Sequence, residues 1–122
     1  MNIQELLNRT DRFAANAGCR ITEVNTEHAV AEMVVTKDHL NGGNVCQGGA
    51  LFTLADLAIA ALMNSQGQLT FGISSTLCLY RVPKRATCFA LKPSASAIII
   101  RFHRWKYVSL TKKVVLSVMS LA

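Results

Sequence analysis

One carboxylate, that of Asp56, lies in a largely apolar stretch of the sequence that follows the glycine pair Gly48 and Gly49. An unpaired carboxylate is costly to bury, so we expect Asp56 to have a partner or a chemical use. The first N–H groups of a helix lack intrahelical acceptors and carry the positive end of its dipole. A carbonyl oxygen bound there would be polarised. Each N–H donor would stabilise the transition state of attack on this carbonyl by about 3–4 kcal/mol. A carboxylate is a suitable base or nucleophile for attack on such a carbonyl.

The spacing of these residues restricts how they can act together. Asp56 follows Gly48 by eight residues, which corresponds to about 12 Å along a helix. A reacting carbon must lie within about 3 Å of the attacking group, and its oxygen equally close to the polarising donor. One helix cannot supply both groups to one carbon. If both act, they come from different subunits, and the functional unit is at least a dimer.

The long helix predicted to carry these groups covers residues 47–65 and ends near Gly67. Its apolar residues fall on nearly every face: Leu51, Leu54, Leu57, Ala58, Ile59, Ala61 and Leu62. A helix that is apolar all round is typically a central, buried one. We therefore expect this helix, and Asp56 with it, to lie inside the domain.

The remaining elements are shorter and surround this helix. We expect an amphipathic helix over 3–17 capped by Gly18, strands over 19–25 and 28–36 that turn near 25–27, a polar loop over 37–46 and a strand over 70–79. Residues 95–102 and 114–119 have strand-like composition, whereas 84–93 is ambiguous. This order predicts an α+β fold in which an antiparallel sheet wraps around one long helix.

Composition limits the class of protein. Of the 122 residues, 51% are hydrophobic and 16% charged, which excludes a disordered chain and predicts one domain. The four cysteines form no CxxC pair, so zinc-ribbon and thioredoxin motifs are absent. No apolar run reaches the roughly 18 residues of a membrane span, and the polar N-terminal sequence does not resemble a secretory signal. We expect a cytoplasmic location with reduced thiols.

The net charge of +6 is unevenly distributed. All seven acidic residues lie at or before Asp56, and the chain after Asp56 holds only basic charges. A nucleic-acid or membrane binder is therefore one alternative function. We consider it less favoured, because the basic residues are scattered through apolar runs and the nearby aromatics match no recognition motif.

The stretch HLNGGNVCQGGALFTLADLA resembles the signature of the hotdog-fold acyl-CoA thioesterases of the PaaI-like type. The matching positions are His39, Asn41, 47–49 and 54–58. The N-terminal helix, the strand AEMVVT and residues 71–76 resemble the family as well, so the resemblance extends through about residue 77. The resemblance implies a hotdog fold, hydrolysis of acyl-CoA to free acid and CoA, and a homodimer or homotetramer whose sites are shared between subunits. It implies no metal and no cofactor other than the CoA of the substrate.

The resemblance also implies roles for individual residues. Asp56 would be the general base or nucleophile, the Gly48 N–H would polarise the thioester carbonyl, and Asn41 would orient the carbonyl or the water. Substrate-binding roles are implied for Gln47, Gly49 and Ser74. Gln47 replaces the histidine usual in the family; it can form hydrogen bonds but cannot take up a proton near neutral pH. The missing histidine also disfavours a dehydratase on this fold.

The chain departs from the family after residue 77. We expect one hotdog domain, 1–122, with a family-like part over 1–77 and an atypical part over 78–122. Reading the codons shifted by two bases permits family-like sequences such as Ala-Gly-Asp-Val-Leu near residue 84. We therefore interpret residues from about 78 onward as a frame-shifted translation of a hotdog gene, which also explains the missing acids there. The sheet is then expected to be incomplete at its C-terminal end.

Simpler interpretations stand beside these. Asp56 can be explained as a carboxylate that is paired for structural reasons. The glycine pair and Asn41 can be explained as turn residues, and Ser74 as an ordinary strand residue. The histidines show no triad or ligand spacing and are expected to be surface or capping residues: His28, His39 and His103. A non-catalytic acyl-CoA-binding protein or an inactive hotdog protein is thus the main alternative to the thioesterase.

Overall fold

The computed structural model describes residues 2–74, 85–91, 97–102 and 117–120. Two short helices precede a strand hairpin, and a long helix separates this hairpin from the remaining strands. In chain order the elements are α1 (Ile3–Thr10), α2 (Arg12–Asn16), β1 (Arg20–Val24), β2 (His28–Val34), a 3-10 turn (Lys37–His39), α3 (Gly48–Asn64), β3 (Thr70–Ser74), β4 (Arg85–Leu91), β5 (Ala97–Phe102) and β6 (Ser117–Ser120).

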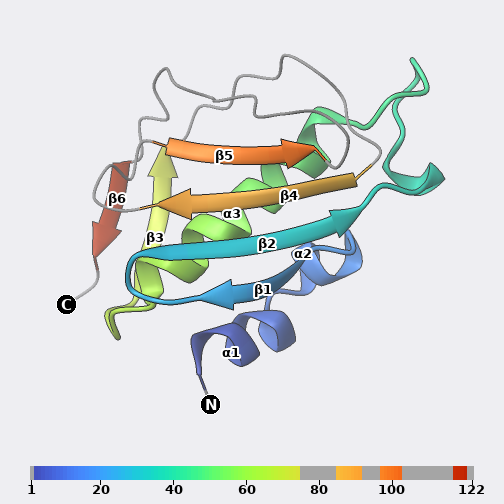
Figure 1. The fold of residues 1–122 in the computed structure, drawn as a ribbon. Coiled ribbons are helices and arrows are strands. Elements are labelled where there is room, and N and C mark those ends of the chain that lie inside the picture. Colours follow the sequence, from blue (N-terminus) through green and yellow to red (C-terminus); the bar gives the residue numbers. More distant parts are fainter. Residues whose placement is uncertain (1, 75–84, 92–96, 103–116, 121–122) are drawn as a thin grey trace.

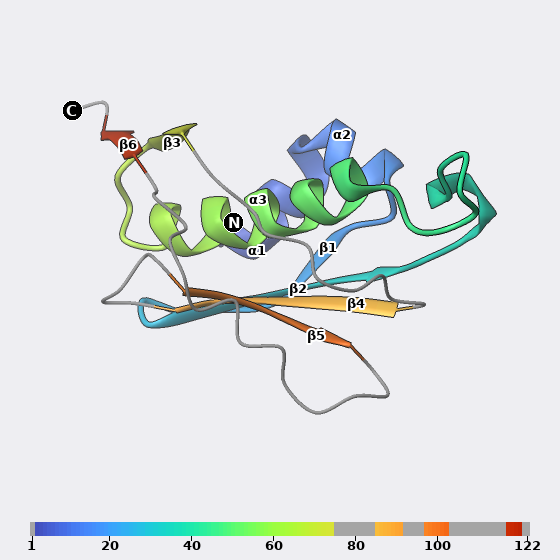
Figure 2. The ribbon, with the colours of Figure 1, turned by 90° about the horizontal axis from the view of Figure 1, so that it is seen from above.

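Four antiparallel strands form a sheet in the order β1-β2-β4-β5, and β3 pairs with β6 in a second, two-stranded sheet. Figure 1 shows the four strands side by side, with α3 behind them. In Figure 2 the larger sheet is seen nearly edge-on, α3 lies across one of its faces, and β3 and β6 lie near the C-terminal end of α3. The predicted α+β arrangement of one long helix against an antiparallel sheet is confirmed.

Three strands come from the part of the chain after residue 77. β4 runs through the segment whose composition is ambiguous, and β5 and β6 fall largely in the two segments with strand-like composition. Among the described residues β5 has no strand partner on its other side. The frame-shift hypothesis stays a prediction, because backbone pairing gives no information about the reading frame of a gene.

The core lies between α3 and the larger sheet. Its largest fully buried side chains come from both layers: Ile21, Met33, Leu51, Leu54 and Leu57. The opposite face of α3 is open, with Gly49, Phe52 and Asp56 exposed along one stripe. The prediction of a helix buried on every face is therefore wrong. The sheet covers one side of α3, and the described residues of α1, α2 and β3 cover the other side only in part.

The predicted helix over 3–17 is interrupted at Asp11. The Asp11 N–H donates to the Leu7 carbonyl, which ends α1. The Asp11 carboxylate then accepts from the Ala14 N–H at 3.0 Å and so caps α2. Aspartate competes well for such capping positions, which is why it starts a second helix here. The segment ends as predicted at Gly18, whose φ of 76° lies in the left-handed region that favours glycine.

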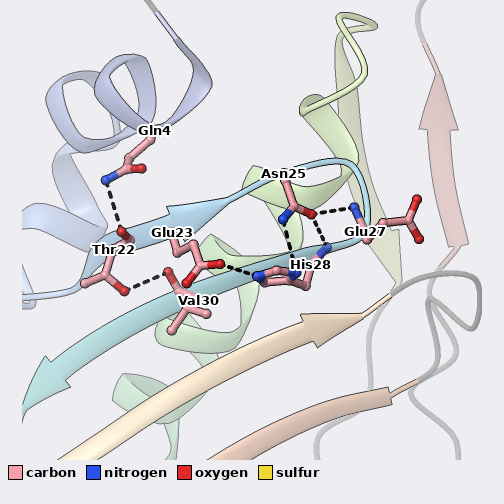
Figure 3. Close-up of polar contacts among 7 residues, drawn as sticks. All are labelled: Gln4, Thr22, Glu23, Asn25, Glu27, His28 and Val30. Carbon is pink, nitrogen blue, oxygen red and sulfur yellow. Dashed lines mark hydrogen bonds and ion pairs between the residues drawn. The ribbon is translucent and has the colours of Figure 1, made fainter.

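Two polar side chains of α1 hold this helix against β1. The Asn8 side chain accepts from the Ile21 N–H at 2.8 Å and donates to the Ile21 carbonyl at 2.9 Å. Gln4 donates to the Thr22 carbonyl (Figure 3). Asn8 thus replaces a strand partner for the backbone of Ile21, whose side chain is fully buried. These bonds fix α1 beside α3.

The hairpin turns where the sequence predicts, between residues 24 and 28. The Asn25 side chain accepts from the N–H groups of Glu27 and His28 at 2.8 and 2.9 Å. The His28 ring contacts Asn25 through Nδ1 and Glu23 through Nε2 (Figure 3). The expectation that His28 is a surface or capping residue agrees with this position in the turn.

Replacing Asn8 by alanine should lower the free energy of unfolding by about 1–3 kcal/mol, because the Ile21 N–H loses its side-chain partner and the Ile21 carbonyl keeps only the 3.3 Å hydrogen bond from Gln4. Asn16→Ala is the matched control, since Asn16 is exposed on α2 and its side chain has no hydrogen bond within residues 2–74. Urea unfolding followed by circular dichroism measures the difference. Equal stability of the two variants would contradict the anchoring role of Asn8.

Candidate active site

Asp56 lies in the middle of α3 on its open face. It lines a cavity of about 320 Å³ formed between α1, α3 and β3. Its Oδ1 atom faces β3 closely, because a Cβ added to Gly72 would stand only 3.9 Å from it. The expected burial of Asp56 inside the core is wrong: the side chain is exposed to solvent at the cavity. The reason is the position of residue 56 on the stripe of α3 that faces away from the sheet.

The electrostatic environment of Asp56 favours its protonated form. Partial burial raises the pKa of Asp56 above its ordinary value of 3.8, and the neighbouring Asp11 carboxylate raises this pKa further. Within residues 2–74 no hydrogen-bond donor contacts the Asp56 carboxylate. A carboxylate that holds no partner and has a raised pKa is a better proton acceptor than an ordinary surface aspartate.

Asp11 is the residue of this cavity that the sequence did not reveal as a candidate. It lines the same cavity as Asp56, although 45 positions separate the two. The sequence carries one signal for Asp11, its suitability as a helix cap. Nothing in the sequence indicates that its charge lies near Asp56, because the contact depends on how α1 and α2 fold back over α3.

The glycine pair starts α3 in the way the sequence predicts. Gln47 is the N-cap residue, and its side-chain oxygen accepts from the Gly49 N–H. A Cβ at Gly49 would lie 2.6 Å from this Gln47 oxygen, so any other residue at 49 would require the end of the Gln47 side chain to move. The Gly48 N–H donates to no acceptor among the described residues. Gly48 therefore presents a free backbone donor at the positive end of the helix dipole.

The loop before α3 is organised by Asn41. Its side-chain oxygen accepts from the N–H groups of Gly43 and Val45 at 2.9 and 3.3 Å, which is the behaviour of a turn residue. This occupies the Asn41 oxygen. The side-chain amide nitrogen of Asn41 has no acceptor within residues 2–74, so a role toward a substrate would use this nitrogen.

His39 caps the 3-10 turn, as expected for a capping residue. Its Nδ1 accepts from the Thr36 N–H at 2.9 Å, so Nε2 carries the proton and donates to the Ala17 carbonyl. Both ring nitrogens are thus engaged in structure. His39 ties the loop before α3 to the end of α2.

A second cavity, of about 800 Å³, lies at the start of α3. Gln47 and Gly49 line it together with residues of α2, β2 and the loop. Asp56 does not line this cavity, and Gln47 and Gly49 do not line the cavity of Asp56. Within one chain the structure therefore keeps the carboxylate apart from the glycine pair, as the spacing along the helix requires.

Ser74 is the last residue of β3, where its backbone pairs with Ser117 of β6. The position of its side chain lies outside what the structure describes, as do residues 75–79 of the strand predicted over 70–79. His103 also lies outside the described residues. The predicted substrate-binding role of Ser74 stays a prediction.

The two described cysteines are buried structural residues. Burial, with smaller effects of Asp11 and Cys46, raises the pKa of the Cys19 thiol to about 11. Burial also raises the pKa of Cys46. Thiols held in this protonated state are poor nucleophiles. In the described part of the chain no group of three or more His, Cys, Asp or Glu residues could hold a metal ion.

Two curated relatives of this chain bear the names of an esterase and a thioesterase. No family model matches the chain. A putative esterase of Archaeoglobus fulgidus is 40% identical over 75 residues, which are 62% of this chain and 49% of that protein. The acyl-coenzyme A thioesterase PaaI of Escherichia coli is 39% identical over 71 residues, which are 58% of this chain and 51% of that protein. The matches thus span about half the length of these two relatives.

Solved structures resemble the whole fold. The E. coli PaaI protein from the phenylacetic acid degradation operon has a TM-score of 0.70 at 29% identity, covering 88% of both chains. A hypothetical thioesterase from Streptococcus pneumoniae with coenzyme A has a TM-score of 0.69 at 18% identity, covering 93% of both chains. The predicted hotdog fold is confirmed. Within the described residues, no helix is long and apolar enough to cross a membrane.

The raised pKa of Asp56 predicts how stability changes with pH. The unfolded chain loses this proton near the ordinary value of 3.8, whereas the folded chain keeps it to higher pH. The Asp56 contribution therefore makes the protein less stable as pH rises through this interval, and the loss persists at neutral pH. Asp56→Asn should unfold at a higher temperature than the wild type at pH 7. The gain should vanish below pH 3.8; a gain of the same size at both pH values would contradict the shift.

Proposed function

We propose that this chain is a member of the PaaI-like family of hotdog thioesterases, which it resembles in sequence and fold, and that it hydrolyses acyl-CoA thioesters to a free acid and coenzyme A. The observation that carries this proposal is the Asp56 carboxylate, which has no hydrogen-bond donor among the described residues and lies at an open cavity with a raised pKa. Coenzyme A enters as part of the substrate, and the reaction uses water as the second reactant. No further cofactor is part of the proposal.

Asp56 acts on the thioester in this proposal, either as general base or as nucleophile. As a base, the carboxylate takes a proton from water, whose oxygen then attacks the thioester carbon and expels the thiolate of CoA. As a nucleophile, the carboxylate oxygen attacks the carbon itself, and water hydrolyses the resulting anhydride. The partial desolvation of Asp56 supports both routes, since it weakens the solvation of the attacking oxygen.

The Gly48 N–H polarises the carbonyl oxygen of the thioester. This assignment rests on the position of Gly48 as the first residue of α3 and on its lack of an acceptor among the described residues. Gln47 and Gly49 border the same helix end and line the 800 Å³ cavity, where we place the substrate on its approach. Asn41 orients the carbonyl or the water through its amide nitrogen, and Ser74 contacts the substrate near the thioester.

Two subunits contribute to each site. Along α3 the carboxylate lies eight residues from the Gly48 donor, about 12 Å. In one chain Asp56 borders a different cavity from Gln47 and Gly49, the two neighbours of Gly48. We propose a homodimer, alone or paired into a homotetramer, in which Asp56 of one subunit faces Gly48 of the other. The exposed apolar side chains Phe52 and Val45, near the start of α3, are suited to such an interface.

Gln47 supports a second candidate function, acyl-CoA binding without turnover. It stands where the family has a histidine, and its side-chain oxygen is held by the Gly49 N–H. A glutamine in this place can position a substrate but cannot exchange a proton. The two candidates differ in a measurable way, because only the thioesterase releases free thiol.

Asp56→Asn should lower the rate of thiol release by at least about 10²-fold, because the amide can neither accept the proton nor attack the carbon. The rate is measured with a thiol reagent and a panel of acyl-CoA substrates. Glu27→Gln is the matched control: Glu27 is exposed in the hairpin turn and its carboxylate points away from its neighbours (Figure 3). Full activity of the Asp56 variant would remove this residue from the mechanism.

Gly48→Pro should lower thiol release by about 10²–10³-fold, because proline lacks the N–H that polarises the carbonyl. Proline is tolerated at the first position of a helix, and the extended conformation of Gln47 (φ −65°, ψ 134°) suits a residue before proline. Gly48→Ala, which keeps the N–H, controls for the added side chain.

The same two variants test whether the site is shared. Neither Asp56→Asn nor Gly48→Pro homodimers contain an intact site. In co-expressed mixtures each heterodimer regains one intact site, so activity should return to about a quarter of the wild-type value for a two-fold dimer. If the two variants are expressed in equal amounts and form heterodimers but the mixture stays inactive, both groups act within one chain.

A further inference from the structure

The cavity beside Asp56 continues along α3 away from the carboxylate. Ile59, Ala60 and Met63 line it on the next two turns of the helix. From Asp56 to Met63 the helix advances seven residues, or about 10 Å. The cavity is therefore an elongated space with an ionisable group at one end and a thioether side chain at the other.

The walls of this space are apolar and come from two other elements. Ile3, Leu6 and Leu7 of α1 form one wall. Leu69 and Phe71, before and within β3, form part of another wall, and both are more than half exposed, at 56% and 52%. Large apolar side chains so exposed around an open cavity are typical of a site that receives an apolar group.

The polar side chains of the cavity other than Asp56 are already engaged. Asn64 donates to the carbonyls of Ala60 and Thr70 at 2.9 and 3.0 Å and accepts from the Thr70 N–H at 2.9 Å. The Thr70 hydroxyl donates to the Gln68 carbonyl at 3.0 Å. Asp11 caps α2 through the Ala14 N–H. Among the described residues, the far end of the cavity thus offers no free side-chain partner for a hydroxyl or charge on a ligand.

We propose that this cavity holds the acyl group of the substrate, and that it selects linear apolar acyl chains of about eight carbons; the thioester end of the chain lies at Asp56. This inference rests on the proposed function. An extended chain advances about 1.2 Å per bond, so about 10 Å holds roughly eight bonds. A volume of about 320 Å³ lies at the small end of ligand sites, which span roughly 300–1,000 Å³.

Two side chains set the length of the accepted chain. Ala60 lies half-way along the cavity, where a larger side chain would fill the space a chain occupies. Met63 lies at the far end, where a smaller side chain would extend it. Opposite substitutions at the two positions should therefore move the chain-length preference in opposite directions, which a general loss of stability does not do.

Binding of coenzyme A thioethers tests the cavity without requiring turnover. Titration calorimetry compares S-octyl-CoA, S-ethyl-CoA and S-dodecyl-CoA on the wild type. We expect S-octyl-CoA to bind at least a hundredfold more tightly than S-ethyl-CoA, because each methylene buried contributes a factor of about four in affinity. S-dodecyl-CoA should gain no affinity over S-octyl-CoA. Equal affinities for the ethyl and octyl compounds would overturn the proposal.

The variants then locate the chain. Ala60→Leu should reduce the preference for octyl over ethyl by about tenfold, whereas Ala15→Leu, the same change at an exposed position of α2 that lines neither cavity, should leave it unchanged. Met63→Ala should raise the affinity for S-dodecyl-CoA severalfold relative to S-octyl-CoA. If both cavity variants keep the wild-type ratios, the acyl chain binds elsewhere and the proposal is wrong.

The hydrolysis of octanoyl-CoA by the wild type separates this inference from the proposed function. If the wild type hydrolyses octanoyl-CoA and both cavity variants keep the wild-type ratios of affinity among the S-alkyl-CoA compounds, the thioesterase is supported and the acyl cavity is overturned. If the affinity ratios shift in the cavity variants but the wild type releases no thiol, the acyl cavity is supported and the thioesterase is overturned. The protein would then bind acyl-CoA without hydrolysing it.

Discussion

The fixed rise of the α-helix is the constraint on which the proposed site depends. Asp56 and Gly48 belong to one continuous helix, so their separation of about 12 Å cannot be closed by any movement of side chains. Two cavities formed by described residues reflect this separation, one at the start of α3 and one beside its middle. A chemistry that needs both groups at one carbon therefore requires a second copy of the helix. In this view the assembly of subunits is part of the active site.

The open face of α3 is the second consequence of the architecture. The four-stranded sheet covers one side of the helix, and its core residues pack there at almost zero exposure. The other side carries Gly49, Phe52 and Asp56 at the surface of the single chain. An exposed stripe with an aromatic residue, a glycine and a carboxylate of raised pKa has little value for the stability of one chain. This exposure agrees with the proposal that the stripe meets a substrate and a partner subunit.

The helix α1 connects stability to specificity. Asn8 binds both backbone groups of Ile21, a residue whose side chain lies in the core, and so fixes α1 in place. The apolar residues of α1 form a wall of the cavity beside Asp56. Asp11, where α1 ends, both caps α2 and contributes to the raised pKa of Asp56. A short helix at the beginning of the chain thereby shapes the surroundings of the carboxylate in the middle of the fold.

The sequence by itself determined most of the elements and the resemblance to a family. The alternation of residues 28–34, the run of alanine and leucine in α3 and the turn at Asn25 are local signals. The motif around Gly48 and Asp56 resembles that of the hotdog thioesterases. The relatives match 71 to 75 residues, close in number to the 77 residues over which the sequence resembles the family. Local backbone preferences and a contiguous motif need no knowledge of contacts between distant residues.

Only the tertiary structure decided what surrounds Asp56. The composition of α3 indicates burial on every side, but a sheet can cover one face only, and Asp56 lies on the other. The proximity of Asp11 and Gly72 to Asp56, and the cavity that they share, arise from segments that the sequence separates by 45 and 16 positions. Burial and charge act through space, whereas a sequence pattern records neighbours along the chain, so these features of the site emerge only when α1, α3 and β3 pack together.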